Sequence, residues 1–250
     1  MLTLTLIGIG CGDPQELTLK AVRAINAADL LLIPRKGTRK SDLAELRRQI
    51  CAEVLTNSQT RIVEFDLPVR DADREDYRGG VDDWHDAVAA VWAREIAGHL
   101  GGSGRVALLI WGDPSLYDSS LRIARRLRPT PQIEVIPGVT SIQALCAAHA
   151  IPLNEIGKPF LVTTGRQLRE SGWPEGVDTV VVMLDGGSAF DALDPKDLHI
   201  WWGAYLGMPG QILLAGPLAE VGARIAKLRA EARARHGWIM DSYIIKRRAV

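Results

Sequence analysis

Two short apolar strands, each running into a Gly-Asp-Pro turn, constrain the fold of this chain more than any other feature. The first strand pattern covers Leu2–Ile9 and leads into Gly10–Pro14, and the second covers Val106–Trp111 and leads into Gly112–Pro114. Strands buried on both faces of a parallel sheet read as continuous apolar runs, and open α/β sheets bind ligands beyond the carboxyl ends of their strands. Glycine lets a ligand approach the backbone closely and proline fixes the turn. The two turns therefore predict a cleft that grips a small molecule largely through main-chain groups.

The order of strands and helices predicts a two-domain α/β fold. Regular alternation in the first half indicates an N-terminal parallel sheet with flanking helices, and the closer strands of the second half indicate a C-terminal mixed α/β domain. We expect the domains to cover 1–128 and 129–250, with the strand at 132–137 able to belong to the first. The expected strands are Leu2–Ile9, Leu30–Ile33, Arg61–Leu67, Val106–Trp111, Ile133–Ile136, Phe160–Thr164, Thr179–Leu184, Leu198–Trp202, Gln211–Ala215 and Trp238–Ile245. The main expected helices are Glu16–Ala28, Trp84–Leu100, Ser115–Leu127 and Leu218–Arg235, and Pro68–Asp83 is expected to be a loop.

The composition is that of an ordinary globular chain without net charge. Its 250 residues include 30 Lys and Arg and 30 Asp and Glu, so no general attraction to nucleic acid or to an anionic membrane is expected. The apolar stretches are too short for a membrane span, and Met1 leads into a strand without the pattern of a signal peptide. Cys11, Cys51 and Cys146 lack paired spacing, which favours reduced thiols in the cytoplasm. No metal-ligand spacing is found among the five histidines, so no metal is expected.

The glycine-rich segment Gly8–Asp13 also invites a dinucleotide-binding interpretation. That fingerprint requires a third glycine or alanine where Asp13 stands, and its ribose-binding acid follows the second strand, whereas Asp29 precedes it. A plain strand–helix turn is a further alternative. In the same way, Asp113 can be a helix N-cap with Pro114 at the first helical position, whatever else the turn does.

Three ordered loops together resemble the tetrapyrrole (corrin/porphyrin) methyltransferase family. They are the first Gly-Asp-Pro turn, the segment Gly112–Tyr117 and the segment Pro137–Ser141. The likeness spans nearly the whole chain, although Cys11 stands where the family commonly has proline. It implies a two-domain fold, S-adenosylmethionine (SAM) as methyl donor, a tetrapyrrole substrate and a homodimer. The resemblance also implies that SAM lies folded between the two domains.

The residues that would contact SAM follow from this resemblance. The segment after the fourth strand would line its methionine end, the polar pair after the fifth strand would lie nearby, and two later segments would contact adenosine. Plain strand packing remains an alternative for the first of those later segments. The implied contacts are Trp111, Gly112, Asp113, Leu116, Tyr117, Thr140, Ser141, Met183, Leu184, Ala215, Gly216 and Pro217.

Five further segments resemble the subgroup that methylates C1 of precorrin-5 and removes an acetyl group as acetate. They are Pro34–Gly37, Leu116–Ser120, Thr140–Ala144, Thr163–Arg166 and Trp202–Gly207.

The candidate catalytic and substrate residues follow from this likeness and from charge. Attack of water on an acetyl carbonyl needs a base, and precorrin carboxylates suit basic side chains. Aromatic residues could line a flat macrocycle, although core packing is an equal alternative for them. The candidate catalytic residues are Asp113, Tyr117, Arg166 and Asp185, and the candidate substrate contacts are Arg35, Lys36 and Tyr205.

Several functions compete with this interpretation. Another precorrin methyltransferase or a diphthamide-pathway methyltransferase of the same fold would share the SAM site and differ in substrate. A nucleotide-dependent oxidoreductase would bind NADH, and a non-catalytic tetrapyrrole carrier would bind the macrocycle without methyl transfer.

Overall fold

The computed structural model describes residues 1–35, 41–70 and 76–247. Contacts divide the chain into two compact units, Met1–Val139 and Thr140–Val250, here called the N-terminal and C-terminal units. The strand that the sequence left open between domains is β5 (Gln132–Ile136), and it pairs with β1 (Leu2–Gly8) in the first unit.

The N-terminal unit is built on a five-stranded parallel sheet, as the alternation of strands and helices predicts. Its order is β3-β2-β4-β1-β5, so the two strands that carry Gly-Asp-Pro turns are neighbours. Parallel strands end at the same edge of a sheet, and the loops after β1, β4 and β5 therefore leave together. The other strands are β2 (Leu30–Arg35), β3 (Arg61–Asp66) and β4 (Gly104–Ile110); the helices are η1 (Pro14–Glu16), α1 (Leu19–Asn26), α2 (Ser41–Val54), α3 (Tyr77–Leu100) and α4 (Ser120–Ala124).

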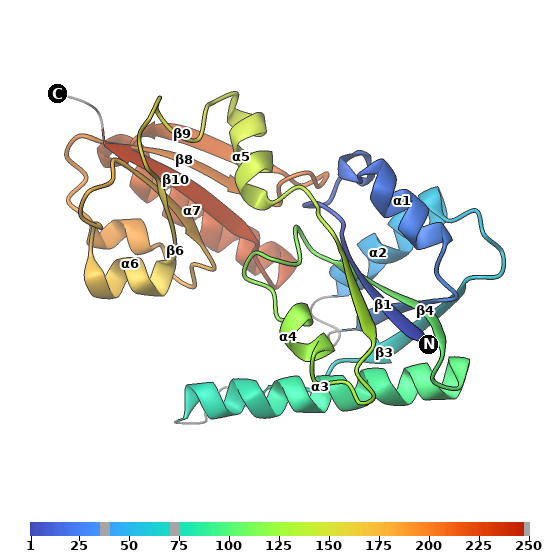
Figure 1. The fold of residues 1–250 in the computed structure, drawn as a ribbon. Coiled ribbons are helices and arrows are strands. Elements are labelled where there is room, and N and C mark those ends of the chain that lie inside the picture. Colours follow the sequence, from blue (N-terminus) through green and yellow to red (C-terminus); the bar gives the residue numbers. More distant parts are fainter. Residues whose placement is uncertain (36–40, 71–75, 248–250) are drawn as a thin grey trace. The chain divides into compact units, whose positions relative to one another are not determined.

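Helices cover both faces of this sheet, which explains why its strands are apolar throughout. Successive side chains of a strand point to opposite faces. Leu4 and Leu6 of β1 pack in one core with Trp92 of α3, whereas Ile7 packs in a second core with Ile25 of α1 and with α2. Figure 1 shows α3 along one face of the sheet and α1 and α2 on the other.

Two helix limits differ from the sequence-based expectation. Helix α3 begins inside the expected loop Pro68–Asp83, because the Asp76 side chain accepts a hydrogen bond from the amide of Gly79 at 3.0 Å and starts the helix there. The helix expected over Ser115–Leu127 is limited to α4. Its first residues instead form a turn, in which Tyr117 has φ 50°, a value that a right-handed helix excludes.

The C-terminal unit contains a mixed sheet of order β6-β7-β10-β8-β9, in agreement with the expected fold class. Only β6 and β7 are parallel, and the other pairs are antiparallel. The α6 and η3 segments were not expected from the sequence. The strands are β6 (Leu161–Thr164), β7 (Thr179–Met183), β8 (Leu198–Ala204), β9 (Ile212–Pro217) and β10 (Asp241–Arg247); the helices are α5 (Ser141–His149), α6 (Gly165–Ser171), η3 (Ala189–Ala192) and α7 (Leu218–His236).

Helices α5 and α7 lie on opposite faces of the C-terminal sheet. A Cβ at Gly203 would come within 2.8 Å of Leu145 of α5, so this face of β8 is closed by α5. Trp202, which precedes Gly203 in β8, points to the other face of the sheet. There Trp202 and Arg229 of α7 both donate hydrogen bonds to Asp241. Within the described ranges, no helix is long and apolar enough to cross a membrane, and no group of three or more His, Cys, Asp or Glu is placed to hold a metal.

Candidate functional site

Main-chain hydrogen bonds join the exits of β1 and β4. The amide of Ile9 donates to the carbonyl of Ile110 at 2.9 Å, and the amide of Gly112 donates to the carbonyl of Gly10 at 2.8 Å. Gly10 has φ 75° and Gly112 has φ 63°, a region that side chains disfavour. The two glycines in the motifs are therefore required by the backbone path that ties the first two loops together.

A third glycine brings the β5 exit into the same seam. A Cβ placed on Gly138 would lie 2.2 Å from the carbonyl oxygen of Gly112 and 2.7 Å from the carbonyl carbon of Gly8. Atoms do not approach so closely, so the three loop exits pack backbone against backbone with no room for a methyl group. We call Gly8, Gly112 and Gly138 the glycine seam.

The aspartates of the two Gly-Asp-Pro turns make the same local hydrogen bond. Asp13 accepts a hydrogen bond from the amide of Gln15 at 2.8 Å, and Asp113 accepts one from the amide of Ser115 at 2.8 Å. Asp113 is the more constrained, because its second oxygen also accepts from the amide of Gly138 at 2.9 Å and its side chain is bonded to the Ser115 hydroxyl. Asp113 thus fixes the β4 loop to the β5 loop.

This bonding also determines the charge state of Asp113. Burial acts to raise the pKa of the carboxyl, but the hydrogen bonds from Ser115 and Gly138 outweigh it and hold the pKa below its usual value. Asp113 is therefore a carboxylate at neutral pH. It provides negative charge at the loop, and its hydrogen bonds give it a positioning role.

Tyr117 is the exposed aromatic residue of the β4 loop. Its side chain is 44% exposed although φ is 50°, a conformation that is an outlier for a bulky residue. Burial raises the pKa of its hydroxyl, which keeps the phenol neutral. Trp111 and Leu116 in the same loop are half-buried. Such strain can accompany ligand sites, although five other non-glycine residues in the described ranges also have positive φ, among them the buried Tyr205.

The unusual Cys11 has a clear role in the first loop. Its amide donates to the Glu16 carboxylate at 2.8 Å, a bond that proline lacks the hydrogen to make. Its sulfur lies 3.8 Å from the carbonyl of Val139. Burial, with a smaller contribution from Glu16, raises the pKa of the thiol to about 12. Cys11 is therefore a structural, unreactive thiol.

In the C-terminal unit, the end of β7 exposes an apolar residue on a strained turn. Met183 is the last strand residue and is half-buried, whereas Leu184 is 64% exposed and has φ 51°. Plain strand packing does not explain Leu184, because this residue lies outside the strand and faces solvent. Its geometry matches that of Tyr117, an exposed apolar side chain held at positive φ.

The strand register separates Leu184 from the other expected adenosine contact. Ala215–Pro217 pairs with the first residues of β8, and the register across β10 places these at the level of the first residues of β7. Leu184 follows the last residue of β7, so it lies toward the other end of the sheet. Ala204 and Met240 lie at the end of the sheet where Leu184 follows β7. The carbonyl of Met240 accepts a hydrogen bond from the amide of Tyr205 at 2.9 Å. The structure does not bring Ala215–Pro217 and Leu184 together. The sequence pattern had no signal for Ala204 or Met240.

Asp185, a candidate catalytic residue, is a buried anchor of the turn after β7. Its carboxylate accepts hydrogen bonds from the amides of Gly187 (3.0 Å) and Ala189 (2.6 Å), from Arg169 (2.7 Å) and from the hydroxyl of Tyr243 (2.8 Å). Burial opposes ionisation, but these bonds hold its pKa below the usual value. With four donors and 6% exposure, Asp185 fixes the conformation of the turn.

A buried ion pair extends this anchor beneath β10. Arg229 donates to Asp241 at 2.7 and 3.2 Å and also bonds the carbonyl of Asp185. Trp202 donates to the same Asp241 carboxylate at 2.8 Å. Burial opposes the charge on Arg229, but its bonds to Asp241 raise its pKa. Arg229 and Asp241 are site-supporting residues that no local sequence motif identifies.

The expected contacts Thr140 and Ser141 form the beginning of α5. The Thr140 hydroxyl oxygen accepts from the amide of Ile142 at 3.2 Å and its hydrogen is directed to Gln143. The hydroxyl of Ser141 accepts from Ser242 of β10 at 3.1 Å. Both side chains are half-buried, and their hydroxyls hold the start of the helix.

The basic segment expected to hold substrate carboxylates is only partly described. Arg35 is half exposed, and its guanidinium makes a two-pronged contact with Asp66 at 3.0 and 3.1 Å. Lys36 lies outside the described residues. An exposed ion pair of this kind is weak enough to be replaced by another carboxylate.

Tyr205 does not match its expected role as a wall for a macrocycle. Its side chain is 3% exposed, its hydroxyl donates to the carbonyl of Trp238 at 2.7 Å, and its ring packs edge-on against Trp238. Core packing, the alternative considered from the sequence, accounts for this residue, and we do not retain it as a substrate contact. Arg166 lies in the first turn of α6 and is exposed.

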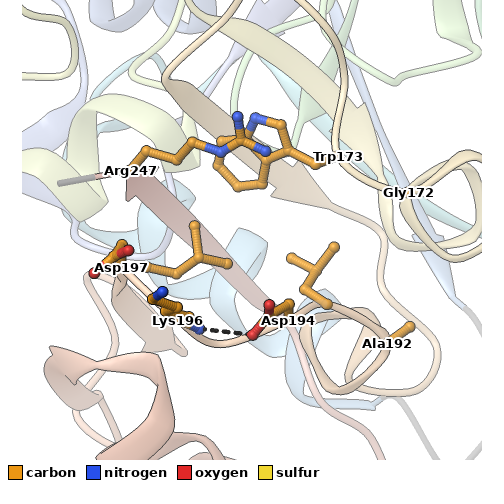
Figure 2. A pocket seen from close by; sticks show the side chains of 9 residues that line it. Gly172, Trp173, Ala192, Asp194, Lys196, Asp197 and Arg247 are labelled. Atoms are coloured by element: carbon orange, nitrogen blue, oxygen red, sulfur yellow. Dashed lines mark hydrogen bonds between the residues drawn. The ribbon is translucent and has the colours of Figure 1, made fainter. Parts of the chain in front are cut away.

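A shallow pocket of about 470 Å³ lies at the end of the C-terminal sheet away from Leu184 (Figure 2). Leu198 at the start of β8 and Arg247 at the end of β10 line it, and the Arg247 guanidinium lies 4.8 Å from the centre of the Trp173 ring. The side chain of Asp194 accepts from the amide of Lys196 at 3.1 Å. None of the residues found to line this pocket is expected to contact SAM.

Tyr117 of the N-terminal unit and Leu184 of the C-terminal unit are each an exposed side chain with a large apolar surface on a backbone at positive φ. Taken separately, each is of the kind that packs on the apolar face of a small ligand. The ionised Asp113 and the peptide groups beside the glycine seam suit the positively charged sulfonium and amino groups of SAM. The chemistry of these residues therefore supports the donor that the family likeness implies.

Comparison with known proteins assigns the chain to a family. Residues 3–222 match the family model of the Tetrapyrrole (Corrin/Porphyrin) Methylases. The chain is 48% identical to precorrin-6A synthase [deacetylating] of Sinorhizobium sp over 253 aligned residues, which cover 100% of this chain and 97% of the relative.

Solved structures agree with this likeness. The crystal structure of a putative cobalamin synthesis related protein (CobF) from Corynebacterium diphtheriae superimposes with a TM-score of 0.83 and 37% identity, covering 99% of each chain. The uroporphyrin-III C-methyl transferase of Thermus thermophilus, solved with S-adenyl homocysteine, gives a TM-score of 0.59 at 22% identity over 97% of this chain and 91% of that one. The second likeness concerns the fold alone.

Proposed function

The chain belongs to the tetrapyrrole (corrin/porphyrin) methylase family, and from this premise we propose that it transfers a methyl group from SAM to C1 of precorrin-5, releasing acetate and forming precorrin-6A. The observation that carries the proposal is the 48% identity to a deacetylating precorrin-6A synthase along the whole chain. The reaction belongs to aerobic cobalamin biosynthesis. Another precorrin or diphthamide-pathway methyltransferase would need the same donor site, so substrate choice is the point to test.

The chain's residues provide orientation and charge. SAM supplies an electrophilic methyl group when bound, and an electron-rich ring carbon can accept it without a protein nucleophile. Tyr117 and the β4 loop would hold the methionine end, with Asp113 fixing the loop and supplying negative charge. Leu184 and Met183 would contact adenosine, with Asp185 holding their turn in place. Arg35 would exchange its partner Asp66 for a substrate carboxylate.

The remaining candidates divide by their environment. Thr140 and Ser141 stay candidate donor contacts, since hydroxyls at a helix start are half-exposed and polar. Ala215, Gly216 and Pro217 stay candidate donor contacts, at the level of the sheet where β7 begins. Arg166 stays a candidate for binding a substrate carboxylate, since it is exposed and cationic.

Two experiments test this function. Calorimetry with S-adenosylhomocysteine should detect binding, and Tyr117→Ala should weaken it by about tenfold, because an aromatic contact of this size contributes on the order of 1–2 kcal/mol. Incubation with SAM and a panel of precorrins, followed by mass spectrometry, should give methyl gain with acetyl loss only for precorrin-5. Methyl gain on a different precorrin would refute the assigned substrate, and absence of S-adenosylhomocysteine binding would refute the enzyme class.

We also propose that the protein acts in the cytoplasm as a homodimer. Strand β6 is at the edge of the C-terminal sheet, and Phe160 and Leu161 are 41% and 38% exposed there. Exposed apolar residues on a free strand edge favour association. Sedimentation should report twice the chain mass, and Leu161→Lys should shift it toward the monomer. A wild-type monomer would refute the proposal.

A further inference from the structure

A small cavity of about 160 Å³ lies in the N-terminal unit directly behind Trp111. It is partly open and is lined by residues at the carboxyl ends of β2, β3 and β4, by α3, and by α4 with the turn before it, and its walls are mostly apolar. An apolar cavity of about this volume can hold a ring of six carbons. The residues that define it for the argument are Arg47, Trp92, Leu108, Trp111, Asp118 and Ser120. We call it the Arg47 cavity.

Arg47 places a buried positive charge in the wall of this cavity. Its side chain is only 9% exposed, and its guanidinium donates to the carbonyls of Leu109 and Leu43, both at 2.9 Å. Burial lowers its pKa to about 10, with Asp118 acting in the opposite direction, so the group stays charged at neutral pH. Buried charges are normally paired, whereas the hydrogen bonds found for Arg47 in the described ranges go to neutral carbonyls. Such a cation attracts a small anion or a carbonyl oxygen.

Trp92, one of the residues that line the cavity, has an indole N–H without a partner among the described residues. Trp92 is 3% exposed, and its Nε1 atom has no hydrogen-bond acceptor among the residues that the structure describes. An unpaired buried donor is costly, and a ligand oxygen in the cavity would satisfy it. Arg47 and Trp92 together provide the donors that an acyl oxygen needs, beside apolar walls suited to a methyl group.

A carboxylate completes the lining. Asp118 accepts from the amide of Ser120 at 2.6 Å, so its side chain is held at the cavity wall by the turn before α4. It is the single carboxylate among the residues found to line the cavity. A carboxylate next to a polarised carbonyl is the arrangement that general-base attack by water requires.

We infer that the Arg47 cavity receives the acetyl group of the tetrapyrrole substrate and retains it as acetate. The inference rests on the proposed function, because a reaction that removes an acyl group needs a place for that group apart from the donor. Arg47 and Trp92 bind the acyl oxygen, and the methyl group packs on the apolar wall. Trp111 belongs to both the cavity and the β4 loop, so the acyl group would lie next to the donor site.

The bond changes balance without a further reactant. A water oxygen adds to the acetyl carbonyl carbon while Asp118 takes one proton from that water. The bond from the carbonyl carbon to the ring then breaks, and its electron pair stays on the ring carbon. That carbon is the nucleophile that the methyl transfer requires. The acyl group leaves as acetic acid, which carries the second proton of the water and loses it to solvent to become acetate beside Arg47. Asp118 returns the first proton to solvent.

Direct binding of acetate is the first test, and it needs neither substrate nor donor. Carbon-13 NMR of [1-13C]acetate titrated with the full-length protein, at constant ionic strength in sodium chloride, should show saturable binding. Arg47→Met should weaken it at least tenfold, which corresponds to about 1.4 kcal/mol. Arg48→Met is the matched control, since the neighbouring Arg48 pairs with Glu64 on the surface and should leave acetate binding unchanged. Trp92→Phe keeps an aromatic side chain but removes the N–H donor together with one of the two fused rings, and should weaken binding several-fold.

Separate readouts distinguish failure of the cavity from failure of the proposed function. Binding of S-adenosylhomocysteine and methyl gain by the substrate report on the enzyme class, whereas acetate release in a single turnover reports on the cavity. Arg47→Met that still binds S-adenosylhomocysteine but loses acetate release supports the inference. Unchanged acetate binding in both Arg47→Met and Trp92→Phe, or no saturable binding in the wild type, would overturn it. Should Arg47→Met not fold, Trp92→Phe alone decides.

Discussion

Alanine at Gly138 is the sharpest test of the glycine seam. The added Cβ would lie 2.2 Å from the carbonyl oxygen of Gly112 and 2.7 Å from the carbonyl carbon of Gly8. To reach the ordinary contact distance of 3.4 Å, the Gly112 carbonyl must retreat by about 1.2 Å. That oxygen is peptide backbone at the exit of β4, so no side-chain rotation can relieve the clash.

The expected cost follows from two contributions. Overpacking of a rigid interior costs about 1–3 kcal/mol. The displaced Gly138 amide also loses its 2.9 Å bond to the Asp113 carboxylate, and a bond to a charged group contributes about 1.5–3 kcal/mol. We therefore expect Gly138→Ala to lower the free energy of unfolding by about 3–5 kcal/mol, a large part of the stability of an ordinary domain.

Urea unfolding followed by tryptophan fluorescence measures this change, and calorimetry with S-adenosylhomocysteine measures its effect on the β4 loop. Gly98→Ala is the control. A Cβ on Gly98, within helix α3, meets no atom within 4 Å, so alanine there should stabilise the protein by about 0.5–1 kcal/mol through helix propensity. Two results together would refute the close packing of the glycine seam. They are a free energy of unfolding for Gly138→Ala within about 0.5 kcal/mol of the wild-type value, and equal binding of S-adenosylhomocysteine.

Three further predictions concern ionisable groups. The pKa of Asp113 is lower in the folded than in the unfolded state, so its stabilising contribution is present above the unfolded pKa and is lost as pH falls through the folded pKa. The difference in unfolding free energy between wild type and Asp113→Asn should therefore shrink toward acid pH. A difference that stays constant with pH would contradict this. Tyr243→Phe removes the 2.8 Å bond to Asp185 and should cost about 1.5–3 kcal/mol in urea unfolding, so a change near zero would show that the bond is absent. With a pKa of about 12, Cys11 should resist iodoacetamide at pH 8 in the native protein and react in urea, as mass spectrometry can follow; equal labelling rates would refute its burial.

The loop exits of the N-terminal unit were predictable because their signals are local. Apolar strands that end in glycine and then in Asp-Pro specify a parallel sheet edge and a bonded turn, and Gly10 and Gly112 indeed have the positive φ that only such a path requires. Tyr117 and Leu184, which the family likeness implied as donor contacts, are exposed. Their strained φ values, however, are visible only in the structure.

Other features depend on contacts between residues that are distant in sequence. Whether Tyr205 faces a ligand or the core depends on Trp238, which arrives from the far end of α7. The level of Ala215–Pro217 depends on β10 inserting between β7 and β8, an order that strand patterns do not encode. Arg47 was missed for the same reason, since an arginine in an amphipathic helix normally faces water and nothing nearby in sequence marks it as buried.

The bond between the Cys11 amide and Glu16 links the identity of two positions. The first loop can keep an acid at position 16 only while the residue at position 11 carries an amide hydrogen, and only while Gly10 stays bare, since a Cβ there would lie 2.6 Å from the Glu16 carboxylate. A relative with proline at position 11 leaves that acid unsatisfied and has reason to replace it. Homologous chains are thus expected to sort into two compatible sets at these positions, and a hybrid that mixes them would inherit a mismatched loop.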